Sequence, residues 1–135
     1  MLLTISFILQ ILATAAMTGI IWLVQIAVYP LFARLDDDRF QDYHNRYMKQ
    51  VSYVIAPLMF LEASTCAVCL YLGDWRDFLL PTLFLALIWG STAFIQVPQH
   101  QRLTPDAVPA LVRSNWIRTT AWTIRLIALT LILSA

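Results

Sequence analysis

The sequence predicts an all-α fold in which a single domain, residues 1–135, forms a bundle of four transmembrane helices. Of the 135 residues, 60% are hydrophobic and only 13% are charged, whereas soluble domains have roughly 45–50% apolar and about 25% charged residues. A domain of this size leaves much of its surface outside, so the excess apolar area requires lipid as its solvent. The apolar residues also fall into four stretches, each close to the ~20 residues that cross a bilayer as a helix.

The four predicted spans are separated by polar connections. Pro98 removes a backbone donor and should end or bend the third span. Pro105 is typical of a new helix start, which begins the fourth span. The short polar turn at residues 73–77 makes the second and third spans an antiparallel hairpin. The predicted spans cover about residues 2–32, 51–72, 78–97 and 105–132.

Basic residues lie almost entirely on one side of the predicted bundle. One side holds only Arg76, whereas the other holds Arg34, Arg39, Arg46, Lys49, Arg102, Arg113 and Arg118. By the positive-inside rule the basic side is cytoplasmic, which places both termini on the extracytoplasmic side. We therefore expect a multi-pass protein of the inner (plasma) membrane.

The linker between the first two spans has a helical pattern of its own. Phe40, Tyr43 and Tyr47 recur near helical spacing among charged residues, and acidic residues 36–38 supply an N-cap and an acidic first turn. This pattern predicts an amphipathic helix between the first and second transmembrane helices. Such a helix lies at the cytoplasmic interface or extends the second span.

Two ionisable residues lie deep inside the predicted spans. Glu62 and Arg125 are each about eleven positions into spans that start from the same face, or ~16 Å deep at 1.5 Å per residue. Because an unpaired charge there costs a few kcal/mol, we expect the two to pair near the midplane. The pair either belongs to a site or only locks two helices together.

Helical spacing gathers further polar residues. On the fourth span one face carries residues at offsets of three, four and three: Asn115, Arg118, Trp122 and Arg125. Gln96 and His100 are four apart on the third span, as are Gln25 and Tyr29 on the first. With Glu62 on the second span, these residues predict a polar cavity at one level of the bundle, open to the cytoplasm. The alternative is that the side chains near helix ends extend to the lipid headgroups.

The two histidines suggest a metal site. His44 and His100 lie on the same predicted side, and with Glu62 they would supply two imidazoles and a carboxylate, a set that suits iron, zinc or a similar divalent ion. The alternative for each histidine is a hydrogen-bonded interfacial side chain. The spacing matches no recognised ligand motif.

Several classes of function are disfavoured. The net charge of +1 provides no concentrated basic face for nucleic acid. Only three glycines are present, too few for a glycine-rich nucleotide cradle. The chain has no internal repeat of transporter size. Proton transport through Glu62 would need a polar path onward to the outer face, which the following residues of the second span do not offer.

The pattern resembles a superfamily of small four-helix membrane proteins that includes the anthrone oxygenase-like group. The residues that carry the resemblance are Tyr29-Pro30, Phe40 to His44, Val97 to His100, and Asn115 with Trp116 and Arg118 through Trp122 to Arg125. In those relatives an Asn commonly follows the Val-Pro dipeptide, whereas here His100 comes one residue later. The resemblance implies an oxygen-dependent oxidation of an aromatic, lipid-soluble substrate.

On that resemblance, His100 would be a base or metal ligand, and Arg118 and Arg125 would stabilise an enolate or phenolate. Trp116 and Trp122 would line an aromatic slot. The full predicted site has catalytic residues Glu62, His100, Asn115, Arg118 and Arg125, and substrate-binding residues Gln25, Tyr29, Gln96, Trp116 and Trp122.

The sequence leaves two functions open. One is a membrane oxidoreductase that acts on a hydrophobic aromatic molecule at this pocket, with a divalent metal such as iron as its candidate cofactor. The other is a non-catalytic transmembrane subunit or scaffold of a larger membrane complex, which binds lipid, quinone or pigment. The expected partners are membrane lipids, a hydrophobic small molecule, and other membrane subunits or further copies of the chain.

Overall fold

The structure is a computed structural model that describes all 135 residues, and it is helical throughout with no strand. It has four long helical rods, each long and apolar enough to cross a membrane. This confirms the predicted all-α fold of four helices that are long and apolar enough to span a membrane. The rods are α1 (Leu2–Leu23), η1 (Val24–Val28) and α2 (Tyr29–Phe32); α3 (Asp37–Leu72); α4 (Trp75–Ser91), η2 (Thr92–Gln96) and α5 (Val97–Gln101); and η3 (Pro105–Ala107) with α6 (Val108–Ser134).

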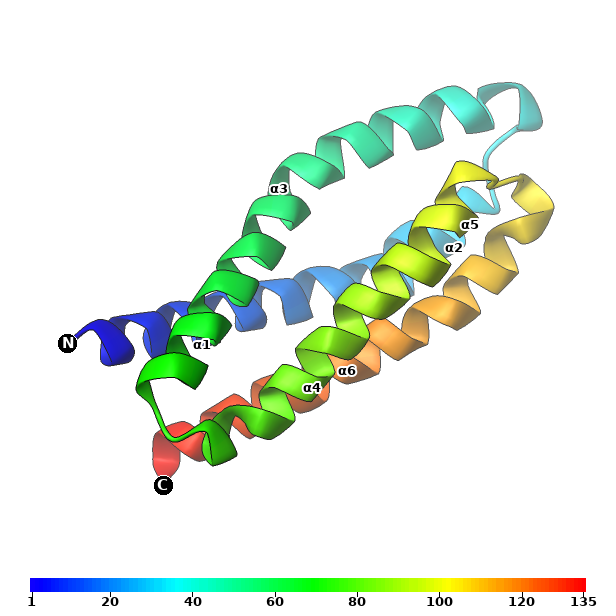
Figure 1. Ribbon diagram of the computed structural model, residues 1–135. Coiled ribbons are helices and arrows are strands. Elements are labelled where there is room, and N and C mark those ends of the chain that lie inside the picture. Colours follow the sequence, from blue (N-terminus) through cyan, green and yellow to red (C-terminus); the bar gives the residue numbers. More distant parts are fainter.

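The rods run antiparallel, so the bundle has two distinct ends (Figure 1). Both chain termini and the turn between α3 and α4 lie at the terminal end, as Figure 1 shows. The α2–α3 and α5–η3 connections, residues 33–36 and 102–104, lie at the opposite end, called here the loop end. The helix α1 packs against α3 and α6, and α4 packs against α6. Away from their shared turn, α3 runs apart from α4 and α5 (Figure 1).

The predicted amphipathic segment forms the first turns of α3. Because α3 is uninterrupted from Asp37 to Leu72, the segment extends the second span, which is one of the two arrangements that its pattern allowed. Its apolar side is buried, where Phe40 and His44 contact the ring of Phe32. The 36 residues of α3 measure ~54 Å, so the helix is much longer than the ~30 Å hydrocarbon core of a bilayer.

Two rods contain a π-helical segment immediately before a residue-proline pair. In the segments 24–28 and 92–96, the residue after the segment donates its N–H to the carbonyl five positions back. The next residues are Pro30 and Pro98, whose rings have no N–H and would clash with the carbonyl four positions back in an α-helix. The wider turn accommodates the ring. The third rod therefore continues through Pro98, where the sequence suggested an end or a bend, and stops at Gln101.

The buried apolar residues form two separate clusters. One lies at the loop end and contains Val24, Tyr29, Phe32, Phe40, Leu103, Val108 and Leu111. The other, called here the central layer, contains Met17, Ile21, Met59, Ile88, Ala121 and Trp122. All four rods contribute to the central layer, which divides the polar interior into two parts.

Candidate functional site

The Glu62–Arg125 ion pair predicted from the sequence forms, and both side chains are completely buried. Arg125 Nη1 donates to Glu62 Oε1 and to the hydroxyl of Thr14, which itself donates to Glu62. Arg125 Nε donates to the Pro81 carbonyl at 3.1 Å, and Trp122 Nε1 donates to Glu62 Oε2 at 3.1 Å. The pair thus joins all four rods and is neutral as a unit, as expected of an ion pair that locks helices together.

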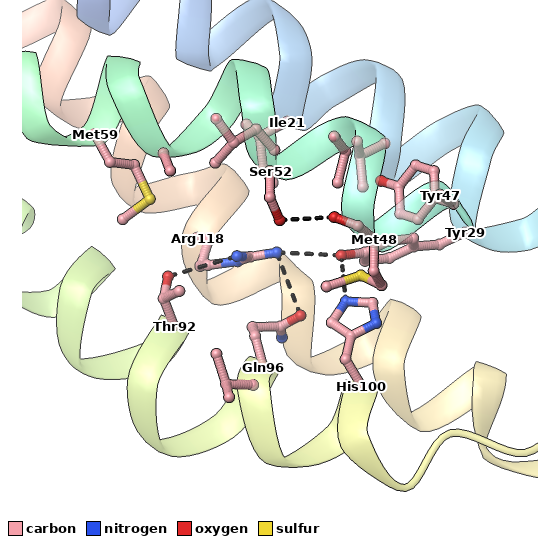
Figure 2. Close-up of a pocket in the computed structure, with 15 residues that line it drawn as sticks. Ile21, Tyr29, Tyr47, Met48, Ser52, Met59, Thr92, Gln96, His100 and Arg118 are labelled. Carbon is pink, nitrogen blue, oxygen red and sulfur yellow. Dashed lines mark hydrogen bonds between the residues drawn. The ribbon is translucent and has the colours of Figure 1, made fainter. Parts of the chain in front are cut away.

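A second polar cluster lies on the loop-end side of the central layer, around Arg118. The side chain is only 7% exposed. Its Nη2 donates to Asn115 Oδ1 at 2.6 Å, and to the Tyr29 hydroxyl and Gln96 Oε1 at 3.3 Å. Its Nη1 has one partner, the Thr92 hydroxyl at 3.5 Å (Figure 2). Nη1 carries two hydrogens, so it retains donor capacity beyond this single long bond.

The charge of Arg118 has no counter-charge. The structure has two ion pairs, the buried Glu62–Arg125 and the exposed Asp42–Arg46. Every acceptor around Arg118 is a neutral amide or hydroxyl group. Two arginines on the same face of α6 are therefore buried, but only Arg125 is neutralised.

The amide side chains of Asn115 and Gln25 hold Arg118 in place. Arg118 Nε donates to Asn115 Oδ1 at 3.0 Å, and Asn115 Nδ2 donates to Gln25 Oε1 at 2.8 Å. Gln25 Nε2 in turn donates to the Val112 carbonyl at 3.0 Å. Because each amide is fixed by both of its polar atoms, the guanidinium is held at a defined position.

A hydrogen-bonded chain leads from Arg118 to the loop end. The Tyr29 hydroxyl lies 2.9 Å from His100 Nε2, and His100 Nδ1 lies 3.0 Å from His44 Nε2. The planes of the two imidazole rings lie within 15° of each other with centroids 5.3 Å apart, so the rings meet edge to edge through this hydrogen bond. The ring of Phe40 lies nearly parallel to His44, with centroids 6.1 Å apart. Tyr29, His44 and His100 are all buried.

A cavity of about 200 Å³ lies between α3 and the α4–η2–α5 rod, next to Arg118. Ten of its fifteen lining residues are hydrophobic. The exposed lining residues Ser52 and Val97 mark its open side, between α3 and α5. Figure 2 shows Arg118 with the side chains of Tyr29, Thr92, Gln96 and His100 around the cavity. The cavity is therefore apolar along most of its wall and polar on the side of Arg118.

The structure assembles part of the predicted site. His100 and Arg118, predicted as catalytic, line the cavity, as do Tyr29 and Gln96, predicted to bind substrate. Gln25 and Asn115 do not line it. Asn115 accepts a hydrogen bond from Arg118, and Gln25 accepts one from Asn115.

The prediction that these polar residues all surround one cavity, at one level of the bundle, is wrong. Glu62 and Arg125 point inward, as expected, but the central layer separates them from Arg118 and the cavity. Arg118 and Arg125 are seven residues apart, or ~10.5 Å along the helix. Both face the interior, and Trp122 packs between them within the central layer.

The predicted aromatic slot is also wrong. Trp116 is 45% exposed and packs edge-to-face on Trp22 on the outside of the bundle, with ring centroids 5.6 Å apart. Trp122 is completely buried within the central layer. Neither ring lines the cavity.

The predicted three-residue metal set is not assembled. His44 and His100 converge, as expected, but Glu62 lies eighteen positions farther along α3, ~27 Å away at 1.5 Å per residue. No group of three His, Cys, Asp or Glu side chains in the structure could hold a metal ion. The facing nitrogens of the two histidines are within hydrogen-bond distance of each other.

Several residues that line the cavity were not identified from the sequence. They include Met48, Ile55 and Met59 on α3 and Thr92 in η2. The three α3 residues are seven and four positions apart, which is the spacing of one helix face. That spacing was a usable signal, but it is equally typical of ordinary packing.

No protein-family model, curated protein or solved structure matches the chain. The chemistry of the cavity and of the groups around it is therefore the basis for proposing a function.

Proposed function

We propose that the protein is a membrane-embedded enzyme that binds a lipid-soluble aromatic molecule with an acidic hydroxyl group, such as a phenol or enol. Arg118 binds the anion that forms when this hydroxyl loses its proton. The observation that supports the proposal is the buried positive charge of Arg118, which has no counter-charge and lies beside a cavity. A buried charge is costly unless it is paired, and a ligand anion would pair it.

The cavity suits the apolar body of such a ligand. A cavity of about 150 Å³ accommodates benzene, so about 200 Å³ accommodates a substituted single ring. Ile21, Ile55 and Met59 contribute apolar surface to the lining. A larger body would extend through the open side between Ser52 and Val97.

We place the loop end on the cytoplasmic side of the inner membrane, by the positive-inside rule. About 20 residues cross the hydrocarbon, and counting from the α3–α4 turn reaches Ser52 on α3 and Gln96 on the third rod. The cavity then lies at the cytoplasmic boundary of the hydrocarbon, and the first turns of α3 extend into the interfacial region. A ligand from the bilayer would enter sideways between α3 and α5, with its polar group near the headgroups.

Anion stabilisation is the chemical contribution that this arrangement supports. A donor held at a fixed position in a largely apolar cavity stabilises a developing negative charge without having to reorganise. Arg118, held by Asn115 and Gln25, is such a donor. In the oxidation that the resemblance implies, the enolate or phenolate is the electron-rich form of the substrate that would react with dioxygen.

A chromophoric phenol tests this function. The probe is an alkyl-substituted 4-nitrophenol, whose absorption spectrum reports its ionisation, and its methyl ether is the control that cannot ionise. We expect the purified protein in lipid nanodiscs to bind the phenolate about 10–100-fold more tightly than the ether, since a hydrogen bond to a charged group contributes about 1.5–3 kcal/mol. Arg118→Gln should remove this preference. Arg113→Gln, which alters an exposed arginine on the same helix, should retain it.

Equal binding of phenol and ether by the unaltered protein would refute the proposed function. So would a preference for the phenolate that persists in Arg118→Gln.

A second candidate function is a non-catalytic subunit of a membrane complex or self-assembly. It is supported by an apolar groove on the outer surface between α3 and α4, lined in part by Ala63, Ala67 and Ala86. Small residues in such a groove let another transmembrane helix approach closely. Native mass measurement in mild detergent tests this role, which predicts a defined larger assembly that Ala67→Leu disrupts and Arg118→Gln does not.

A further inference from the structure

We infer that Tyr29, His100 and His44 form a proton relay that carries the ligand's proton from the cavity to the loop end of the bundle. The inference rests on the proposed function, because the proton comes from the acidic hydroxyl that Arg118 would bind. It adds His44, which does not line the cavity, to the residues that support the reaction.

Arg118 fixes the direction of the hydrogen bonds in this chain. A guanidinium has only donors, so the Tyr29 oxygen accepts from Arg118 Nη2 and its own hydrogen is free to bond to His100 Nε2. In neutral His100 that nitrogen is the acceptor, so the ring hydrogen is on Nδ1, which donates to His44 Nε2. Every donor in the chain therefore points from the cavity toward His44.

This direction allows one proton to move without a change in any heavy-atom contact. The ligand O–H bond breaks and its proton bonds to the Tyr29 oxygen, while the Tyr29 proton passes to His100 Nε2. The Nδ1 proton of His100 passes to His44 Nε2, which makes His44 an imidazolium. One proton leaves the ligand and one is gained by His44, with no electron transferred. The ligand anion remains beside Arg118.

The surroundings of His44 favour transfer along the chain rather than into bulk water. His44 is 3% exposed and is covered by the non-titratable rings of Phe32 from α2 and Phe40 from α3. The titratable side chain that faces it is His100 of α5. His44 lies about two turns from the start of α3, so the proton that it gains is at the loop end of the bundle.

A pH-jump experiment on the bound nitrophenol probe tests the relay. The probe is bound as the neutral phenol, the pH is raised rapidly, and its ionisation is followed by absorbance. We expect His44→Gln to slow ionisation by about 10²-fold, in the range of general acid–base contributions, because the amide can accept the His100 hydrogen bond but cannot take up a proton. The affinity for the preformed phenolate, measured at alkaline pH, should change less than about threefold, since His44 does not contact the ligand.

Two further variants separate a relay from a structural role. His44→Ala removes the ring, and added imidazole should restore the rate in proportion to its concentration. Tyr29→Phe keeps the ring but breaks the link between Arg118 and His100, so it should slow ionisation as His44→Gln does. The matched control is Tyr43→Phe, which alters an exposed hydroxyl on α3 and should have no effect.

Unchanged ionisation rates in His44→Gln and Tyr29→Phe would overturn the relay and leave the proposed function intact. A parallel loss of rate and of phenolate affinity in both variants would also overturn it, because that result indicates a structural role. Failure of the unaltered protein to bind the phenolate would overturn the proposed function and the relay together.

Discussion

The two buried arginines of α6 should respond in opposite ways to the same substitution. Arg125→Gln removes the partner of Glu62 and leaves a carboxylate in a fully buried position. Arg118→Gln removes a charge that has no counter-charge in the structure. The substitutions are chemically identical and lie two turns apart on one helix face, so each serves as the control for the other.

The magnitudes follow from the contacts. Loss of one partner from a buried ion pair costs about 3–5 kcal/mol, and Arg125→Gln additionally gives up the bond to the Pro81 carbonyl. Arg118→Gln loses hydrogen bonds to neutral groups, about 1 kcal/mol each, while it removes an uncompensated buried charge that itself costs a few kcal/mol. We therefore expect Arg125→Gln to lower the free energy of unfolding by about 3–5 kcal/mol and Arg118→Gln to leave it unchanged within about 1 kcal/mol or to raise it.

Reversible unfolding in mixed detergent and SDS micelles, followed by circular dichroism, measures both values. The double variant Glu62→Leu with Arg125→Leu should recover most of the stability that Arg125→Gln loses, because no charge is then left unpaired. Equal destabilisation by Arg118→Gln and Arg125→Gln would contradict these expectations. A double variant that is no more stable than Arg125→Gln would contradict them as well.

Further predictions concern the helix geometry and the tryptophans. Deletion of the exposed Ala93 should turn the π-helical segment η2 into an α-helix, in which the ring of Pro98 clashes with the carbonyl four positions back, so we expect it to lower the free energy of unfolding by about 3 kcal/mol. Deletion of the exposed Ala86 in α4 should instead rotate one part of the rod against the other by ~100° and disrupt packing. Added Pro98→Ala should recover stability in the first deletion and not in the second, which thermal unfolding checks. Trp122→Phe should lower the free energy of unfolding by about 1–3 kcal/mol, because the buried Oε2 atom of Glu62 then loses the hydrogen bond that it accepts from Trp122. Trp116→Ala should change phenolate affinity less than about twofold, since this ring lies outside the bundle. A larger loss of affinity would show that Trp116 belongs to the binding site.

The Glu62–Arg125 pair was predictable because depth in a transmembrane helix can be counted along the sequence. Both residues lie near the same distance from the same bundle end, and an unpaired charge at that depth is costly. Spacing also correctly predicted the inward face of α6, where Asn115, Arg118, Trp122 and Arg125 are all buried. Spacing along one helix shows which residues share a face, however, and does not show what packs between two of them.

The separation of Arg118 from Arg125 could not be predicted because the intervening layer is supplied largely by other helices. Met17 and Ile21 come from α1, and Ile88 comes from α4. The π-helical segments also change the usual period, since Ser91 and Gln96 are both buried although they are five positions apart. The cavity itself arises where α3 runs apart from α4 and α5. Pro57 inside α3 is a residue that typically bends a helix, but the sequence does not show in which direction the helix diverges.

The most direct test of the central proposal, that Arg118 binds a ligand anion, is an experimental structure of the protein with a brominated phenol probe. The anomalous signal of bromine gives the position and orientation of the ring. We expect the ring in the cavity between α3 and the α4–η2–α5 rod, with its oxygen about 2.7–2.9 Å from Arg118 Nη1. A probe bound elsewhere, or a carboxylate of a second protein chain in contact with Arg118, would contradict the proposal.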